Sequence, residues 1–187
     1  MEAGGGVITV CFHGAESTGK SVLARAFSAR FGYPWVPEFG RDYCEAKFAH
    51  TGSTDVTMDD LLAIAERQDR TARKAAGARP PVLLLDTDPL MTAAWAEMLF
   101  GTVPPALLGY PKADRYLLFA PDVPWVADGS RFFGDPAARA RFAALAEAVL
   151  VRAGVAFTRI GGDWRERERQ ATAAIEVDRK SAFPISC

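Results

Sequence analysis

Short apolar runs alternate with stretches of helical periodicity along most of the chain. Continuous apolar character predicts five buried strands, at about residues 7–13, 35–36, 82–86, 116–120 and 156–160. Apolar residues at helical spacing predict helices at about residues 21–31, 41–50, 57–74, 90–100, 135–152 and 164–179. Strands that alternate with helices form βαβ units, so the pattern predicts a three-layer α/β fold with a mostly parallel, five-stranded sheet.

The composition is that of an ordinary globular domain and narrows the class of partner. The chain has 187 residues, of which 49% are hydrophobic and 24% charged, and this predicts one domain over residues 1–187. A net charge of −1 argues against a protein whose main task is to bind nucleic acid or an anionic membrane. No apolar run is long enough to span a bilayer, and the N-terminus has no signal-peptide pattern. Three widely spaced cysteines favour the reducing cytoplasm.

The segment between the first predicted strand and helix carries the strongest chemical signal. Residues 14–21, GAESTGKS, match the phosphate-loop pattern G-x-x-x-x-G-K-[ST] in the strand–loop–helix context that it requires. Backbone N–H groups of such a loop surround the phosphates of a nucleotide, the lysine reaches the β and γ oxygens, and the hydroxyl binds Mg²⁺. We therefore expect ATP and Mg²⁺ as cofactors, bound by Gly14, Glu16, Ser17, Thr18, Gly19, Lys20, Ser21 and Val22.

Two carboxylates follow the strand at residues 82–86 and are candidates for the magnesium site. Residues two apart on an extended backbone share a side, so Asp86 and Asp88 are expected to point into one site. Asp86 would bind the metal together with Ser21, and Asp88 would face the substrate. Asp88 precedes Pro89, however, so the alternative is that it caps the next helix.

The segment after the second predicted strand is expected at the same edge of the sheet. Ligands of parallel sheets bind beyond the carboxyl ends of the strands, which makes Glu38, Phe39 and Arg41 candidates for substrate binding. Glu38 would either accept a proton from an acceptor hydroxyl or hydrogen-bond a sugar diol, the two tasks that phosphoryl transfer to an alcohol leaves to the protein, and Asp88 is the alternative carboxylate on the acceptor side. A simple surface pair of Glu38 and Arg41 is the alternative.

The stretch at about residues 121–141 is predicted to form a small lid over the phosphates. It contains carboxylates, an aromatic ring and arginines, which suit a sugar and base pocket, and its candidate residues are Asp122, Trp125, Asp128, Arg131, Arg139 and Arg141. A lid arginine can contribute roughly 10³- to 10⁵-fold to turnover. Arg139 and Arg141 lie about 200° apart on a helix, so only one of them is expected to face the nucleotide.

The expected roles of the tryptophans and of the remaining charged residues depend on whether they adjoin a loop at the ligand edge or lie within a helix. Trp35 and Trp125 adjoin loops at the ligand edge and are candidates for stacking on a base. Trp95 and Trp164 are expected to pack in the core. The alternating charges of residues 165–169 are interpreted as a solvated helix face.

Several strings occur together in an order that resembles the ribosylnicotinamide kinase domain of the NadR type, a member of the P-loop kinase superfamily. They are the phosphate loop at residues 14–21, EFGRDY at 38–43, Gln68, LDTD at 85–88, and WVADGSR at 125–131. The resemblance runs from about residue 7 to residue 175. It implies a P-loop kinase fold and ATP-dependent phosphorylation of the 5′-hydroxyl of nicotinamide riboside to nicotinamide mononucleotide, a step of NAD salvage. It also implies a stand-alone kinase, with catalytic residues Lys20, Glu38, Asp86, Asp88 and Arg131.

The chain departs from the family at the positions that hold the nicotinamide ring. The family has an aromatic residue before the E-[FY]-G-R string, where this chain has Pro37, and further aromatics shortly after the glutamine. Here Gln68 is followed by Asp69, Arg70 and Arg73. The first alternative is therefore a P-loop kinase for another nucleoside or a small alcohol, and the second is a nucleotide-dependent regulatory ATPase. A GTPase is disfavoured because the chain has no asparagine for the guanine-reading N-K-x-D string.

Overall fold

A computed structural model describes residues 6–125 and 134–182 and confirms the predicted sheet. Its strands are β1 (Ile8–His13), β2 (Trp35–Val36), β3 (Val82–Asp86), β4 (Arg115–Phe119) and β5 (Phe157–Ile160). They are ordered β2-β3-β1-β4-β5, and all four pairings are parallel. Because the strands run in one direction, their carboxyl ends meet at one edge, where a ligand site is expected.

The helices begin and end close to the predicted positions. They are α1 (Lys20–Phe31), α2 (Phe39–Thr51), α3 (Met58–Ala76), α4 (Pro89–Phe100), α5 (Pro105–Gly109), α6 (Pro136–Arg152) and α7 (Trp164–Ala182). The Thr57 side chain caps α3, and the Asp60 carboxylate accepts in return from the Thr57 backbone N–H at 2.7 Å. Asp135 caps α6 by accepting from Ala138 N–H at 2.8 Å. The sequence analysis missed α5, because one turn of helix is too short to show periodicity.

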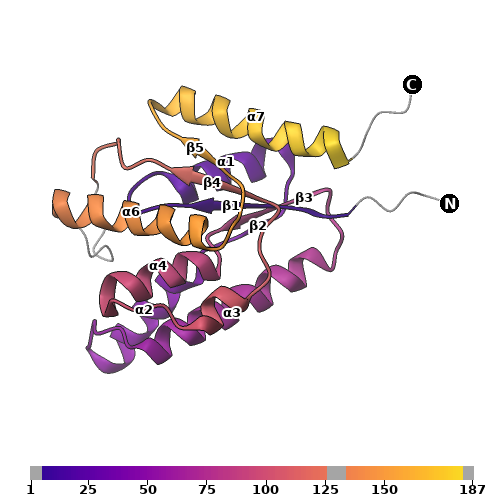
Figure 1. Cartoon of the computed structure of the whole chain (residues 1–187). Coiled ribbons are helices and arrows are strands. Elements are labelled where there is room, and N and C mark those ends of the chain that lie inside the picture. Colours follow the sequence, from indigo (N-terminus) through magenta and orange to yellow (C-terminus); the bar gives the residue numbers. More distant parts are fainter. Residues whose placement is uncertain (1–5, 126–133, 183–187) are drawn as a thin grey trace, which may run out of the picture.

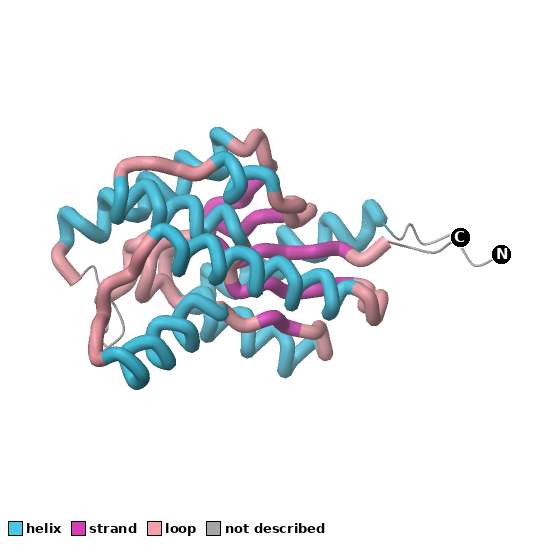
Figure 2. The backbone as a smooth tube through the Cα atoms, turned by 90° about the horizontal axis from the view of Figure 1, so that it is seen from below, coloured by secondary structure: helices cyan, strands magenta, loops and turns pink. Residues whose placement is uncertain are grey.

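The helices form one layer on each side of the sheet (Figure 1; Figure 2). Helices α1 and α7 cover one face, and α3, α4 and α6 cover the other. Alternate side chains of β1 point to opposite faces of the sheet. Val10 and Phe12 pack against α1 and α7, whereas Cys11 packs against the helices on the other face. None of the helices in the described part of the chain is long and apolar enough to cross a lipid bilayer.

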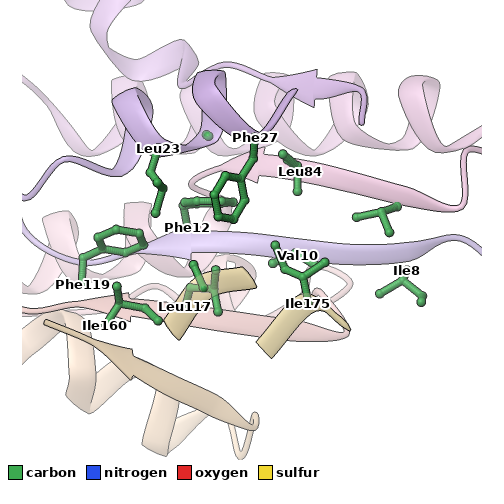
Figure 3. Close-up of a cluster of buried hydrophobic side chains, with 13 residues drawn as sticks. Ile8, Val10, Phe12, Leu23, Phe27, Leu84, Leu117, Phe119, Ile160 and Ile175 are labelled. Carbon is green, nitrogen blue, oxygen red and sulfur yellow. The ribbon is translucent and has the colours of Figure 1, made fainter. Parts of the chain in front are cut away.

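The core under α1 and α7 holds the central strand in place (Figure 3). Phe12 of β1 stacks on Phe119 of β4 with ring centroids 5.7 Å apart and meets Phe27 of α1 edge-on at 6.3 Å. Phe12, Phe27 and Phe119 are all almost completely buried. This packing fixes α1 directly beyond the carboxyl end of β1 and so sets the place of the loop between them.

Candidate functional site

The loop between β1 and α1 has the backbone shape of a phosphate loop. Gly14 has φ +132°, and a Cβ atom there would lie 2.7 Å from the Phe119 carbonyl oxygen, so only glycine fits. Gly19 has φ +86°, and Ser17 also adopts a left-handed conformation with φ +56°. The loop leads directly into α1, whose N-terminal N–H groups and helix dipole favour an anion.

The side chains of the loop turn toward its interior. Lys20 is buried, and its Nζ donates to the Ala15 carbonyl at 2.7 Å. The Thr18 hydroxyl donates to the same carbonyl at 2.8 Å. The ammonium group is therefore held at the loop, where it can meet the phosphates of a nucleotide.

A cavity of about 310 Å³ opens beside this loop and has two chemically different ends. The charged end is lined by the phosphate loop and α2, and includes Glu16, Lys20, Arg25, Glu38 and Arg41. The apolar end is lined by α3, α4, α6 and the loop before α3, and includes Val56, Leu61, Ile64, Met91, Trp95 and Phe142. Such a cavity suits a ligand with a polar part and a flat, apolar part.

Glu38 lies at the start of α2 and faces the charged end of the cavity. Burial, reinforced by the nearby charges of Asp86 and Glu16, raises the pKa of Glu38 to about 7, although Lys20 and Arg41 oppose the shift. A carboxyl group with a pKa near neutrality can both accept and release a proton at physiological pH. The structure thus places Glu38 in the same cavity as the phosphate loop, with a pKa suited to proton transfer.

Asp86 and Asp88 do not share a site, contrary to the sequence-based expectation. Thr87 between them has φ +72°, which breaks the alternation of an extended strand. Asp88 caps α4 by accepting from Leu90 N–H at 3.0 Å, and its second oxygen accepts from the Tyr116 hydroxyl at 2.5 Å. Neither Asp86 nor Asp88 is among the lining residues of the cavity, and of the two roles predicted for Asp88 the structure shows the helix cap.

Asp86 lies under the phosphate loop and has the properties of a metal-binding carboxylate. It is 1% exposed and shares a hydrogen bond with the Ser21 side chain. Its Oδ1 is buried and has no hydrogen-bond partner in the described part of the chain. Burial raises the pKa of Asp86, and the hydrogen bond from Ser21 and the charges of Lys20 and Arg25 act against this shift. A divalent cation held by Asp86 and Ser21 would satisfy the orphaned oxygen and keep the carboxylate ionised.

Gln68 of α3 connects the segments that surround Glu38 and Asp86. Its Oε1 accepts from Phe39 N–H at 2.9 Å, and its Nε2 donates to the carbonyls of Pro37 at 3.2 Å and Thr87 at 3.3 Å. The side chain is 3% exposed, so these bonds are shielded from water. Gln68 thus fixes the start of α2 relative to the turn after β3, a role that composition and periodicity did not reveal.

Three predicted substrate-binding side chains lie away from the cavity. The Phe39 ring packs on Tyr43 with centroids 6.0 Å apart and lies under the Arg67 guanidinium. Trp125 carries the Arg139 guanidinium 5.8 Å above its ring. The Asp122 carboxylate is used by Arg167 and by Gly162 N–H, the latter at 2.7 Å. Each of these three side chains is occupied by other residues of the protein, and none of the three lines the cavity.

The predicted lid falls partly outside the described residues. Asp128 and Arg131 lie in the gap at 126–133. Arg139 donates from Nη2 to the Ser17 carbonyl at 3.3 Å, so it lies against the phosphate loop, whereas Arg141 is exposed. Of the two arginines that helical geometry separates, Arg139 is therefore the one on the side of the phosphate loop.

The arrangement of the tryptophans matches the expectation only in part. Trp95 packs against the core, as expected, with its ring centroid 4.6 Å from that of the buried Phe142, but it also lines the cavity. Trp164 was also expected in the core, but it is 42% exposed and covers Gly19 of the phosphate loop. Trp35 packs in the core layer, with the Arg25 guanidinium 5.8 Å above its ring. Helical spacing alone does not distinguish a core face from the wall of a cavity, which explains why the sequence did not reveal the second role of Trp95.

Arg167 contradicts the interpretation of residues 165–169 as a solvated face. Its side chain is completely buried, and it bonds to main-chain carbonyls and to Asp122. The neighbouring Arg169 remains exposed and pairs with Glu166. Alternating charge concealed the one position of this segment that points inward, because a lone buried arginine has no signature in local periodicity.

Comparison with known proteins agrees with the geometry of the loop and the cavity. The trifunctional NAD biosynthesis/regulator protein NadR of Escherichia coli K12 is 31% identical over 159 residues, which are 82% of this chain and 38% of that protein. NadR of Salmonella typhimurium LT2 is 30% identical over 163 residues, with the same two shares. The chain thus spans about two fifths of the length of these curated relatives, and the expected resemblance to NadR is confirmed.

Solved structures show the same fold. A NadR protein in complex with NR superposes with a TM-score of 0.76 at 22% identity, over 97% of this chain and 53% of that one. Deoxyadenosine kinase from M. mycoides superposes with a TM-score of 0.64 at 9% identity, over 91% of this chain and 100% of that one. These likenesses confirm the P-loop kinase-like α/β fold.

A family model described as an AAA domain matches residues 9–167. The match begins in β1, includes the phosphate loop and the strand that carries Asp86, and ends at Arg167 in α7. Because the matched region covers far more than half of the sequence, the chain belongs to this AAA domain family.

Proposed function

We propose that this chain is an ATP-dependent kinase that phosphorylates the 5′-hydroxyl of nicotinamide riboside and yields nicotinamide mononucleotide for NAD salvage. The observation that carries the proposal is the single cavity that joins a phosphate loop, a carboxyl group with a pKa near 7 and an apolar, aromatic-lined end. The relatives support it, because NadR is a trifunctional NAD biosynthesis/regulator protein and one NadR structure contains NR.

The charged end of the cavity would bind ATP and Mg²⁺. The loop N–H groups and Lys20 would hold the phosphates, and Arg139 would approach from α6. Ser21 and Asp86 would hold Mg²⁺, which supplies charge neutralisation at the β and γ phosphates when it is bound. The orphaned, buried Oδ1 of Asp86 supports this assignment.

Glu38 would act as the general base for the acceptor. Its carboxylate takes the proton of the 5′-hydroxyl, the hydroxyl oxygen forms a bond to the γ-phosphorus, and the bond from that phosphorus to the β–γ bridging oxygen breaks to release ADP. The pKa of about 7 matches this task, since the group is substantially ionised at neutral pH and remains basic enough to accept a proton.

The apolar end of the cavity would hold the base of the nucleoside. Trp95 and Phe142 present aromatic surface there, and a tryptophan face attracts a flat, positively charged ring such as a pyridinium. The two rings would replace the family aromatics that are absent at Pro37 and after Gln68.

The direct test is turnover by the purified chain with ATP, Mg²⁺ and nicotinamide riboside. We expect release of ADP and formation of nicotinamide mononucleotide, measured by chromatography and mass spectrometry. Adenosine, cytidine and thymidine serve as matched acceptors. Turnover of one of these and not of nicotinamide riboside would contradict the proposed acceptor but retain the kinase.

A regulatory ATPase is the second candidate, favoured by membership of the AAA domain family. It predicts ATP binding or slow hydrolysis that no nucleoside accelerates. Calorimetric titration separates the two, because a kinase binds a nucleoside in the presence of a non-hydrolysable ATP analogue and a regulatory ATPase does not.

A further inference from the structure

The first turn of α7 contacts the phosphate loop through two residues, Trp164 and Arg167, that are not among the cavity lining. Arg167 is completely buried, and its guanidinium donates to the main-chain carbonyls of Thr18 at 3.0 Å, Ala120 at 3.0 Å and Gly162 at 2.8 Å. It also donates to the Asp122 carboxylate. One side chain therefore joins the phosphate loop to the segments that follow β4 and β5.

We propose that Arg167 is a positioning residue for nucleotide binding, which holds the phosphate loop in its anion-binding shape. The proposal rests on the proposed function, because it assumes that the loop binds a nucleotide. In a trans peptide the C=O and the following N–H point in opposite directions. A bond from Arg167 to the Thr18 carbonyl therefore points the Gly19 N–H away from Arg167, and Gly19 is among the residues that line the cavity.

A second contact from the same turn supports this role. Trp164 lies three residues before Arg167 and therefore on the same side of α7. A Cβ atom on Gly19 would lie 2.9 Å from the Trp164 ring, so the indole covers this glycine closely. The two α7 side chains thus contact consecutive residues of the loop, one through the Thr18 carbonyl and one through Gly19.

The chemistry of the contact requires arginine. A guanidinium has five N–H donors in a planar fork and can serve several acceptors at once, whereas a lysine ammonium is a single point on a flexible stem. Asp122 provides the counter-charge: one oxygen accepts from Arg167 and the other from Gly162 N–H at 2.7 Å. Without the guanidinium, three carbonyls and this carboxylate would lose a partner, and the loss is most costly at the Thr18 carbonyl, whose hydrogen bond is buried.

The test compares Arg167→Lys with Arg169→Lys, two conservative variants of the same helix. Arg169 is exposed and pairs only with Glu166 among the interactions described for it, so it is the matched control. Calorimetric titration with a non-hydrolysable ATP analogue and Mg²⁺ is expected to give a 10- to 100-fold higher Kd for Arg167→Lys and a change below twofold for Arg169→Lys. In turnover assays the KM for ATP rises and the KM for the acceptor stays near the wild-type value.

Chemical rescue separates positioning from a merely structural role. Added guanidinium ion at millimolar concentration is expected to restore at least part of the ATP affinity of Arg167→Ala, and urea at the same concentration is not. A Kd for ATP that stays at the wild-type value in Arg167→Lys, together with a lower melting temperature, would overturn the proposal.

Asp122→Asn provides an independent variant should Arg167→Lys not fold. It keeps an oxygen for Gly162 N–H and removes the negative charge beside Arg167, so a three- to tenfold increase in the Kd for ATP is expected, and an unchanged Kd would contradict the proposal. Titration of the wild-type chain with the ATP analogue separates the proposed kinase function from the proposed role of Arg167. A wild-type chain that binds no ATP would overturn the proposed function and this role together, whereas tight wild-type binding with unaffected variants would overturn this role alone.

Discussion

The two ends of the cavity are built in different ways. The charged end is formed largely by eight residues of the segment 14–22, whose side chains and backbone conformations follow from one local motif. The apolar end takes Val56, Leu61, Met91, Trp95 and Phe142 from the loop before α3 and from α3, α4 and α6, which are far apart in the sequence. Phosphate chemistry is therefore encoded locally, whereas the acceptor site exists only after the helices have packed.

The ends also differ in charge. Among the described lining residues, the ionised groups Glu16, Lys20, Arg25, Glu38 and Arg41 lie on the phosphate loop, α1 and α2. Burial raises the pKa of Glu38 to about 7, with Asp86 and Glu16 reinforcing the shift and Lys20 and Arg41 opposing it. Changes at the charged end should thus alter the chemical step, and changes at the apolar end should alter acceptor binding.

Lys20→Ala should produce the largest effect. It removes the cation that meets the phosphates and is expected to lower kcat by about 10³-fold, the scale for removing one electrostatic contact to the transition state. ADP release measures the effect, and circular dichroism should show an intact fold. Lys74→Ala, at an exposed position of α3, is the control. Retained activity in Lys20→Ala would refute the assignment of the phosphate loop.

Glu38→Gln should lower kcat by about 10²-fold, because a general base is lost at the junction of the two ends. In the wild type, activity should rise as the pH increases through about 7, where Glu38 becomes ionised. A profile for Glu38→Gln that keeps the same rise would assign the base to another group.

The same group makes the stability of the ligand-free protein depend on pH. The pKa of Glu38 is raised in the folded state, so the folded chain binds more protons than the unfolded chain between about pH 4.5 and pH 7. The contribution of Glu38 to the free energy of unfolding is therefore present below pH 4.5 and is lost as the pH rises to about 7. Denaturant titrations should show this fall in the wild type and a smaller fall in Glu38→Gln.

Asp86→Asn and Asp88→Ala should separate metal binding from capping. Asp86→Asn is expected to lower activity 10- to 100-fold at limiting Mg²⁺, with partial recovery at high Mg²⁺. Asp88→Ala loses the cap of α4 and the bond from Tyr116, which should cost about 1–3 kcal/mol of unfolding free energy with little change in kcat. Activity assays and thermal melts of both variants check the contrast, and equal losses of activity would argue that both carboxylates serve the reaction.

Trp95→Ala should have the smallest effect on activity among these variants, and only the KM for the acceptor should change. Loss of the aromatic face is expected to raise the acceptor KM about tenfold while the KM for ATP stays constant, and Trp95→Phe should recover part of the affinity. Trp35→Phe, in the core layer beside Arg25, is the control and should leave both KM values unchanged. An acceptor KM that does not respond to Trp95→Ala would place the base elsewhere.

Sequence reasoning succeeded where structure is local and failed where partners are distant. It located the phosphate loop, the helix that begins at about residue 57 and the strand that ends at Asp86, because each depends on neighbouring residues. It left Asp88 open between the substrate side and a helix cap, because it could not foresee the left-handed conformation of Thr87 that turns the chain. It misjudged Arg167, because three acceptors of its side chain lie in segments up to 149 positions away.

The sequence by itself determined the α/β fold and the phosphate loop, since apolar periodicity and a glycine pattern act over a few residues. Only the tertiary structure decided which side chains of the helices face the cavity and which acceptors surround Arg167. Packing makes that decision because burial is a property of the assembled layers: Trp95 becomes a cavity wall, and Asp122 a partner of Arg167, only when α4, α6 and α7 lie against the sheet.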